Sequence, residues 1–230
     1  MSKDIEMNMI DAILDKPFGF TFKRKQYYIY PTTIGKKMIT ARLLETIKSH
    51  KKITNLKDLF FISDLYKDVY LRLIAIHTLK TKDEVLDKKI VDKRIRKFRK
   101  MNNNDIATLV MFILQEDNPE DYINHIGLNI DREKKNKIAR VKKDNNNRYT
   151  FGGKSIYGTL IDMACEKYGW SFDYIVWGIS YINLFMLLED SISEIYLTDE
   201  ERKKVKISND TDIINADDPK NREKILAMFK

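Results

Sequence analysis

The longest near-continuous apolar run of the chain, Tyr174–Leu188, is the feature that most constrains its fold. It lies within the stretch Tyr168–Ile195, which also holds both tryptophans, Trp170 and Trp177. The run is shorter than the roughly 20 residues that cross a bilayer, and acids flank it on both sides, so we expect no membrane span. Only one glycine and two polar residues interrupt it: Gly178, Ser180 and Asn183. Either the rest of the chain or a partner must therefore cover it.

A pair of helices is expected around this run, at residues 154–168 and 172–195, with Gly169 between them. On the second helix Tyr174, Trp177 and Tyr181 would share one face, while isoleucines fill most of another. Apolar residues all round a helix favour burial on every side. Aromatic residues and methionine are also typical of binding anchors, so a face that takes a partner helix stays open. The predicted partner-binding residues are Tyr174, Trp177, Tyr181 and Phe185.

The remaining pattern predicts a mainly α protein with a small N-terminal β-hairpin. Phe20–Phe22 and Tyr28–Tyr30 alternate as strands, with Lys23–Gln26 as the turn and the aromatic rings on one face. Pro31-Thr-Thr33 is a helix start signal. Apolar residues recurring every three or four positions predict these helices: 4–15, 34–49, 56–79, 82–100, 105–114 and 119–126.

Changes in composition divide the chain into four expected segments. Residues 1–128 hold the hairpin and a helical region, and 129–150 form a basic linker or a partly ordered helix. Residues 151–197 contain the helical pair. Residues 198–230 form an acidic tail without a sustained period, ending in a short helix.

Positive charge is concentrated in two segments of a chain whose net charge is +8. Residues 82–100 and 131–148 are rich in Lys and Arg. Three interpretations remain open: a solvated face, contact with nucleic-acid phosphates, or contact with an acidic protein. For the nucleic-acid alternative, the candidate residues are Lys93, Arg94, Lys97 and Lys100. Neither a zinc finger nor an aromatic RNA-binding pattern accompanies them.

The sequence offers no arrangement typical of catalysis. Gly152-Gly153-Lys154-Ser155 lacks the earlier glycine and the preceding strand of a phosphate loop, so we expect a turn and a helix start. His77 is expected to cap a helix or lie in solvent, because no second ligand recurs at metal spacing. Neighbouring acids such as Glu189 and Asp190 would point about 100° apart on a helix. We expect no enzyme activity, metal or cofactor.

A cytoplasmic location is the expectation, in the host cytoplasm if the protein is viral. Cys165 is the single cysteine, so an internal disulfide cannot form, and we expect a small buried thiol. The first residues mix acids with apolar side chains, which is unlike a signal peptide.

Two sequence elements and the helical region between them resemble the tail assembly chaperones that tailed bacteriophages encode beside the tape measure protein. The first element is Lys16-Pro17-Phe18-Gly19-Phe20, leading to Tyr28-Ile-Tyr30-Pro31-Thr32-Thr33-Ile34-Gly35-Lys36. The second is Tyr168-Gly169-Trp170-Ser-Phe-Asp173-Tyr174-Ile-Val-Trp177, followed by Asn183 and a Met/Leu run. The resemblance covers about half of the chain, and residues 80–150 depart from the compact members of that family.

The resemblance implies a non-enzymatic chaperone or adaptor for virion assembly. Such proteins bind long amphipathic tape measure helices and keep them soluble until tail tube subunits polymerise. The expected partner is therefore a tape measure or tail tube protein. Self-association through the hairpin edge is also possible on physical grounds. A structural component of a phage or phage-like particle, and a basic helical nucleic-acid-associated protein, remain as alternatives.

Overall fold

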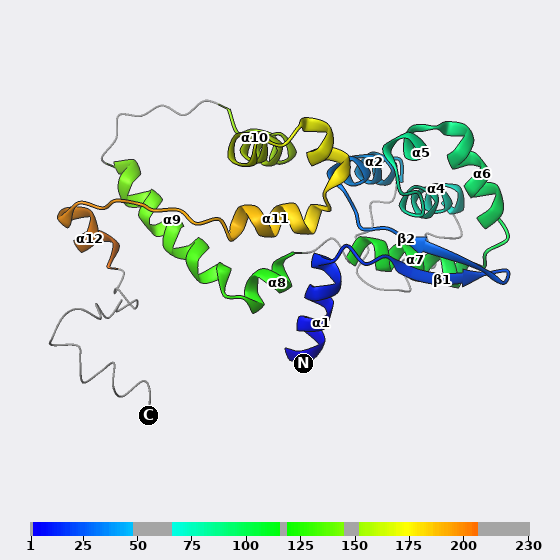
Figure 1. Cartoon of the computed structure of the whole chain (residues 1–230), viewed down its shortest axis with the longest axis horizontal. Helices are drawn as coiled ribbons and strands as arrows, with labels where there is room; N and C mark the ends of the chain where they lie inside the picture. The colour runs from blue at the N-terminus through cyan, green and yellow to red at the C-terminus, as the bar shows by residue number, and fades with distance from the viewer. Residues whose placement is uncertain (1, 48–65, 116–118, 145–151, 207–230) are drawn as a thin grey trace. The chain divides into compact units, whose positions relative to one another are not determined.

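The computed structural model describes residues 2–47, 66–115, 119–144 and 152–206. The protein is mainly helical with a two-stranded antiparallel hairpin near its N-terminus, which confirms the predicted fold class (Figure 1). The early elements are α1 (Ser2–Ile13), β1 (Phe18–Phe22), β2 (Lys25–Ile29), α2 (Ile34–Glu45), α4 (Lys67–His77), α5 (Lys82–Leu86) and α6 (Lys88–Phe98). The later ones are α7 (Asn103–Gln115), α8 (Glu120–His125), α9 (Leu128–Asp144), α10 (Ile156–Tyr168), η1 (Tyr174–Gly178), α11 (Tyr181–Glu189) and α12 (Asp199–Val205).

The chain forms two compact units that each combine distant parts of the sequence. The first unit joins residues 1–129 with 150–192, and the second joins 130–149 with 193–230. In the second unit, the Lys142 ammonium donates to the Tyr196 carbonyl at 2.6 Å. Thr198 caps α12 in a capping box with Glu201, although the sequence predicted no periodic element there. The predicted terminal helix and residues 56–65 of another predicted helix lie outside the described residues.

The hairpin turn is tighter than the sequence predicted. It contains only Lys23 and Arg24, whose φ angles of 49° and 60° lie in the left-handed region. Two consecutive left-handed residues give the primed turn that matches the twist of paired strands. Phe20 consequently pairs with Tyr27 rather than with Tyr28. Tyr27 faces the core and Tyr28 is exposed, so the predicted parity of the second strand was wrong by one residue.

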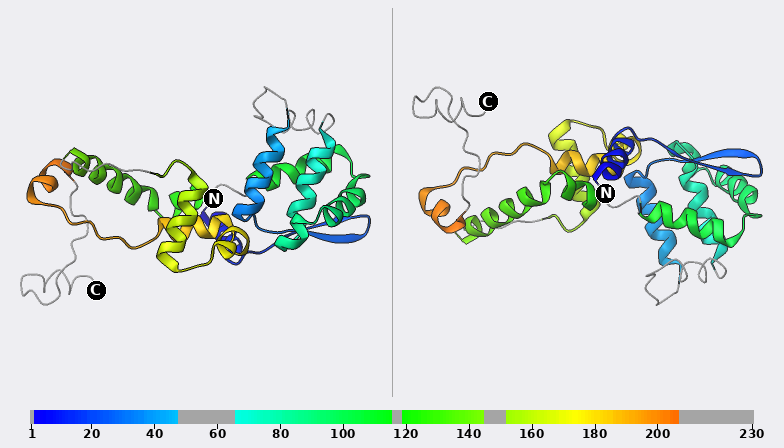
Figure 2. Two further views of the ribbon diagram at one scale, coloured as in Figure 1. Left: turned by 90° about the horizontal axis from the view of Figure 1, so that it is seen from above. Right: turned by 90° about the horizontal axis from the view of Figure 1, so that it is seen from below.

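The main core lies under the hairpin, where α2, α4, α6 and α7 meet. Figure 2 shows the hairpin alongside the helices that its rings contact. Phe98 at the end of α6 is fully buried, and its ring centroid lies 5.0 Å from that of Tyr27 and 6.0 Å from that of Phe20. Phe18 contacts Phe112 of α7 with ring centroids 4.1 Å apart. Because a two-stranded hairpin is marginal by itself, these aromatic contacts supply the stability that it needs.

The predicted helix 82–100 is two helices, α5 and α6. Asp87 has an extended backbone, and its carboxylate accepts hydrogen bonds from the N–H groups of Lys89 and Ile90. It therefore acts as the N-cap of α6 and ends α5 after five residues. The buried stripe of α6 consists of Val91, Ile95 and Phe98, and α5 contributes Val85 to the same core.

The predicted continuous helix 172–195 was also wrong. Tyr174–Gly178 forms a single π-helical turn, Ile179 is extended, and a second helix, α11, begins at Tyr181. Ser180 caps α11 by accepting from the Asn183 N–H. A smaller core forms around these segments from residues of α2, α10, η1 and α11: Ile34, Ala164, Ile175, Ile179, Leu184 and Leu188.

Substitution of Gly35 by Ala should destabilise the first unit. A Cβ at position 35 would lie 2.8 Å from atoms of the Trp177 indole, so the ring must shift. Overpacking of this kind costs about 1–3 kcal/mol, measurable as a lower urea midpoint. Gly158→Ala is the control, since a Cβ there would meet only Ser155, at 3.3 Å, and alanine favours a helix. Equal midpoints for the two variants would contradict close packing at Gly35.

Candidate functional site

The segment before α2 and the segment before α11 meet at the centre of the first unit. Thr33 and Ser180 form an isolated antiparallel bridge, and the Tyr181 N–H donates to the Thr32 carbonyl at 2.7 Å. Both bridge residues are also N-caps, because Thr33 accepts from the Lys36 N–H and Ser180 accepts from the Asn183 N–H. This contact, called the cap junction below, fixes the starts of two helices that are about 150 residues apart in sequence.

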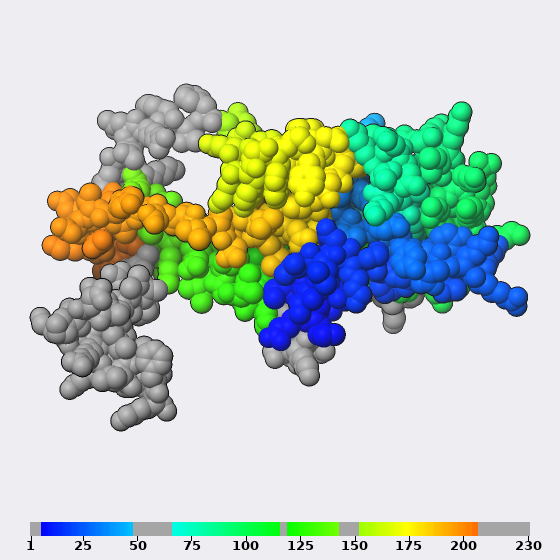
Figure 3. Space-filling view, viewed as in Figure 1, coloured from blue at the N-terminus to red at the C-terminus, as the bar shows by residue number. Residues whose placement is uncertain are grey.

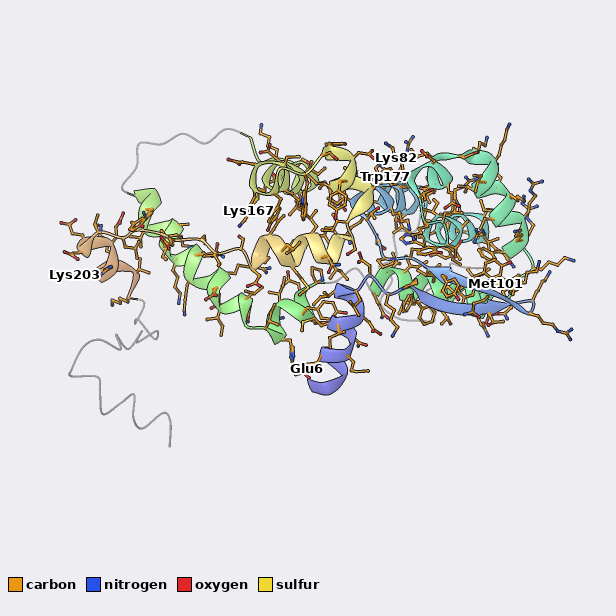
Figure 4. All side chains as sticks on the ribbon, viewed as in Figure 1. Glu6, Lys82, Met101, Lys167, Trp177 and Lys203 are labelled. Atoms are coloured by element: carbon orange, nitrogen blue, oxygen red, sulfur yellow. The ribbon has the colours of Figure 1, made fainter. Side chains whose placement is uncertain are left out.

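Trp177 lies at the cap junction, against α2. Its half-buried indole packs on the Cα of Gly35, where a larger residue would collide with it, and contacts the main core. Figure 4 labels Trp177 next to Lys82, and the Lys82 ammonium forms an ion pair with Asp173 just before η1. The π-helical turn is thus tied to both α2 and α5.

His77 is buried behind the cap junction and is only 1% exposed. Its Nδ1 lies 3.3 Å from the Thr32 hydroxyl and its Nε2 lies 3.0 Å from the Thr40 hydroxyl. The backbone carbonyl of His77 also accepts from the Tyr30 N–H. Burial, with smaller contributions from Lys36 and Lys37, lowers the pKa of His77 to about 3. The solvated alternative for His77 was therefore wrong, because the neutral ring links the α2 segment to α4.

Lys36 is a second buried titratable group, at 2% exposure. Its ammonium lies 5.6 Å from the centroid of the Tyr30 ring. Burial lowers the pKa of Lys36 to about 8, and the charge of Glu84 partly offsets this shift. Lys36 and His77 are both too buried to reach a substrate, so we assign the cap junction a structural role.

The four predicted partner-binding residues do not share one helix face. Tyr174 is exposed and its ring meets that of Trp170 edge-on, with centroids 5.2 Å apart. Trp177 is directed to the main core, whereas Tyr181 packs on the smaller one. Tyr181 and Phe185 are neighbours on α11, with ring centroids 5.8 Å apart, and Lys37 lies 4.2 Å over the Tyr181 ring. Whether these residues bind a partner stays a prediction.

Exposed apolar residues of α1, with Leu14 directly after it, form a row that no sequence pattern had marked as a site; the Leu14 N–H donates to the Ile10 carbonyl and continues the helical turn. Met7, Ile10 and Leu14 are 61%, 50% and 69% exposed. Their spacing of three and four residues places them on one side of the helix. Figure 3 shows α1 uncovered on the viewed face. The helical period was visible in the sequence, but it could not show which face the fold leaves uncovered.

Asn183 connects α1 to α11. Its side-chain amide donates to the Ile13 carbonyl at 3.2 Å and to the Asp15 carboxylate at 3.0 Å. Asn183, which interrupts the apolar run in the sequence, thus links the end of α1 to α11 by hydrogen bonds. It brings the α1 row into the neighbourhood of the helix that carries Tyr181 and Phe185.

Two hollows open on the described surface of the first unit. One, of about 640 Å³, lies among α1, the start of β1 and the cap junction, and reaches Thr32 and Ser180. Its charged residues Asp11 and Lys16 pair with each other at 2.9 Å. The other, of about 510 Å³, is lined by Asp68, Arg72, Asp92, Arg96 and Arg99 together with apolar residues. Arg72 and Asp92 form an ion pair at 3.2 Å. In the first hollow, the Thr32 hydroxyl lies 3.3 Å from Nδ1 of His77, but the His77 ring is only 1% exposed and the contact belongs to the cap junction.

The four predicted nucleic-acid-binding residues lie in α6 and just after it. Lys93, Lys97 and Lys100 are exposed. Arg94 is half-buried; it donates to the Thr78 carbonyl at 3.3 Å, and its guanidinium lies 5.7 Å over the Tyr27 ring. Arg94 therefore has a packing role that the sequence did not reveal.

The remaining candidates for chemistry are placed without a reactive partner in the described part of the chain. Cys165 is half-buried against the smaller core, less enclosed than predicted. Ser155 caps α10 after two glycines with positive φ, which confirms the predicted turn and helix start. Across the described ranges, no three His, Cys, Asp or Glu side chains gather as metal ligands.

Comparison with known proteins adds no relative. No family model, no curated protein and no solved structure matches the chain. Among the helices that the structure describes, none is both long and apolar enough to cross a membrane.

The free energy of unfolding should fall as the pH drops from about 6.5 toward about 3. Unfolded His77 takes up a proton near its ordinary pKa of 6.5, but folded His77 does so only near pH 3. Protons therefore favour the unfolded chain across this window, by up to about 1.4 kcal/mol per pH unit. Urea unfolding at a series of pH values measures the slope.

His77→Gln should reduce that slope, because an amide does not titrate there but can still meet the Thr40 hydroxyl. An unchanged slope in His77→Gln would contradict a buried neutral histidine.

Proposed function

We propose that this protein is a non-enzymatic assembly chaperone or adaptor of the phage tail type. Its partner would be a tape measure or tail tube protein, and its ligand an amphipathic helix of that protein. The two sequence elements that carry the resemblance support this proposal, since they meet where Trp177 of the second packs on Gly35 of the first. A shared structural core is a physical reason for both elements to occur in one chain.

The exposed apolar row of α1 is the observation that carries the proposal. A long amphipathic helix exposes an apolar stripe that aggregates in water, and a second apolar stripe can cover it. Met7, Ile10 and Leu14 present such a stripe, and methionine adapts to varied partners. Because Asn183 anchors α1 to α11, Tyr181 and Phe185 lie on the helix next to this stripe.

The row can be tested with Met7→Ser, Ile10→Ser and Leu14→Ser combined in one variant. The probe is a fluorescent amphipathic peptide of about 20 residues, roughly six helical turns, built from Leu, Glu and Lys with zero net charge. Removing three apolar anchors should weaken binding at least about tenfold, since each buried apolar side chain contributes more than about 1 kcal/mol. Fluorescence anisotropy measures the affinity.

The matched control carries Met38→Ser, Leu86→Ser and Ile90→Ser, three exposed apolar residues of other helices. It should bind the peptide like the wild type. Equal losses of peptide affinity in both variants would show non-specific hydrophobic binding rather than a site. An unchanged affinity of the α1 variant would refute the proposal. Circular dichroism verifies that both variants keep their helical content.

Phe185 and Trp177 should respond differently to substitution. Phe185→Ser should lower peptide affinity with little change in the melting temperature, because the ring is half-buried at the surface of α11. Trp177→Ala should lower the stability by about 3–5 kcal/mol, as expected for a large ring packed on a core. If Phe185→Ser lowers the melting temperature strongly while the fraction that stays folded binds the peptide like the wild type, Phe185 has a role in the core alone.

A further inference from the structure

Two segments of the first unit carry many bases and no acids. Residues 16–44 contain neither Asp nor Glu, and the same is true of residues 93–104. The first segment includes the hairpin turn with Lys23, Arg24 and Lys25, all exposed. The second includes the C-terminal half of α6. These two segments are far apart in sequence, so their positive charges form one surface only if the fold places them side by side.

Phe98 brings them together. Its ring centroid lies 6.1 Å from that of Phe22 and 5.0 Å from that of Tyr27, so the hairpin packs on the end of α6. The Lys23 ammonium lies 5.5 Å over the Phe22 ring. Lys25 pairs directly with Phe22, and directly paired residues point to the same side of a hairpin. The turn bases therefore lie close to the bases that flank Phe98.

One flank of α6 faces the hairpin. The guanidinium of Arg94 lies 5.7 Å over the Tyr27 ring, which fixes the orientation of this flank. Lys93 and Lys97 are four residues apart and so lie on the same side of the helix, and Lys100 follows two residues after its end. The opposite flank is different, because Arg96 and Arg99 line a hollow with Asp68 and Asp92.

We propose that a basic surface of the hairpin and α6 binds the phosphate backbone of duplex nucleic acid without reading its sequence. This surface consists of Lys23, Arg24, Lys25, Lys93, Arg94, Lys97 and Lys100. Arg94 positions the flank through its contacts with Tyr27 and Thr78, and the six exposed residues contact phosphates.

The surroundings of the surface favour a phosphate polymer over an acidic protein. Protein interfaces depend on apolar or aromatic anchors, and the rings on the Lys25 side of the hairpin are already packed on Phe98, whereas the exposed Tyr28 lies on the opposite side. The same packing argues against single strands, which need free rings for base stacking. A regular array of phosphates needs only distributed positive charge.

The test is a salt titration of binding to a fluorescent 20-base-pair DNA duplex of arbitrary sequence, about two helical turns. Wild-type protein should bind at low salt. The logarithm of its association constant should fall linearly with the logarithm of the salt concentration, with a slope close to minus one for each phosphate contact. Lys23→Asn with Arg24→Gly removes two charges and installs the Asn-Gly turn preferred by such hairpins, so the hairpin should keep its turn. This pair and Lys97→Gln with Lys100→Gln should each weaken binding and reduce the salt slope by about two.

The matched control is Lys137→Gln with Arg140→Gln, which removes two exposed charges of α9 in the second unit. It should leave the affinity and the slope nearly unchanged. An equal loss in this control would overturn the proposal, because net charge alone would then explain binding. The proposal would also be overturned if the protein did not bind the duplex at low salt. Two further results would overturn it: tighter binding of a single strand with the same number of phosphates, or binding of polyglutamate as tight as that of the duplex.

The two proposals can fail separately. The α1 variant should bind DNA normally, and the hairpin and α6 variants should bind the peptide probe of zero net charge normally. Loss of both activities in either variant would indicate a folding defect and remove that variant as support.

Discussion

The first unit depends on one contact, the bridge between Thr33 and Ser180. Each residue caps a helix, and the bridge therefore sets the start of α2 and the start of α11 together. Trp177 packs on Gly35 beside it, and His77 holds the same segment from α4 through the hydroxyls of Thr32 and Thr40. The polar groups are buried but hydrogen-bonded, which is the condition under which burial is tolerated.

This arrangement separates the interior from the surfaces that can bind. Because Trp177 and Lys36 are used inside the unit, the proposed functions rest on residues that the core does not need. The apolar row of α1 is held near α11 by Asn183, and the basic surface is held together by Phe98.

The sequence predicted the elements better than their ends. The helices α2, α7 and α10 were predicted close to their observed positions, helped by start and stop signals such as Thr33 and Gly169. The breaks inside 82–100 and 172–195 were missed, since Asp87 and Ser180 cap only when the chain around them leaves the helix. The two-residue turn was missed as well, because Lys and Arg rarely adopt positive φ.

By itself, the sequence determined the fold class, the absence of an internal disulfide, and the abundance of apolar and basic residues available for binding. These follow from composition and short-range periodicity, which need no knowledge of distant contacts. Only the tertiary structure decided that Trp177 packs inward while Tyr174 stays exposed, and that Phe22 next to the hairpin turn packs on Phe98 of α6. Such outcomes depend on contacts between residues far apart in the chain, and no local pattern records which partner each side chain meets.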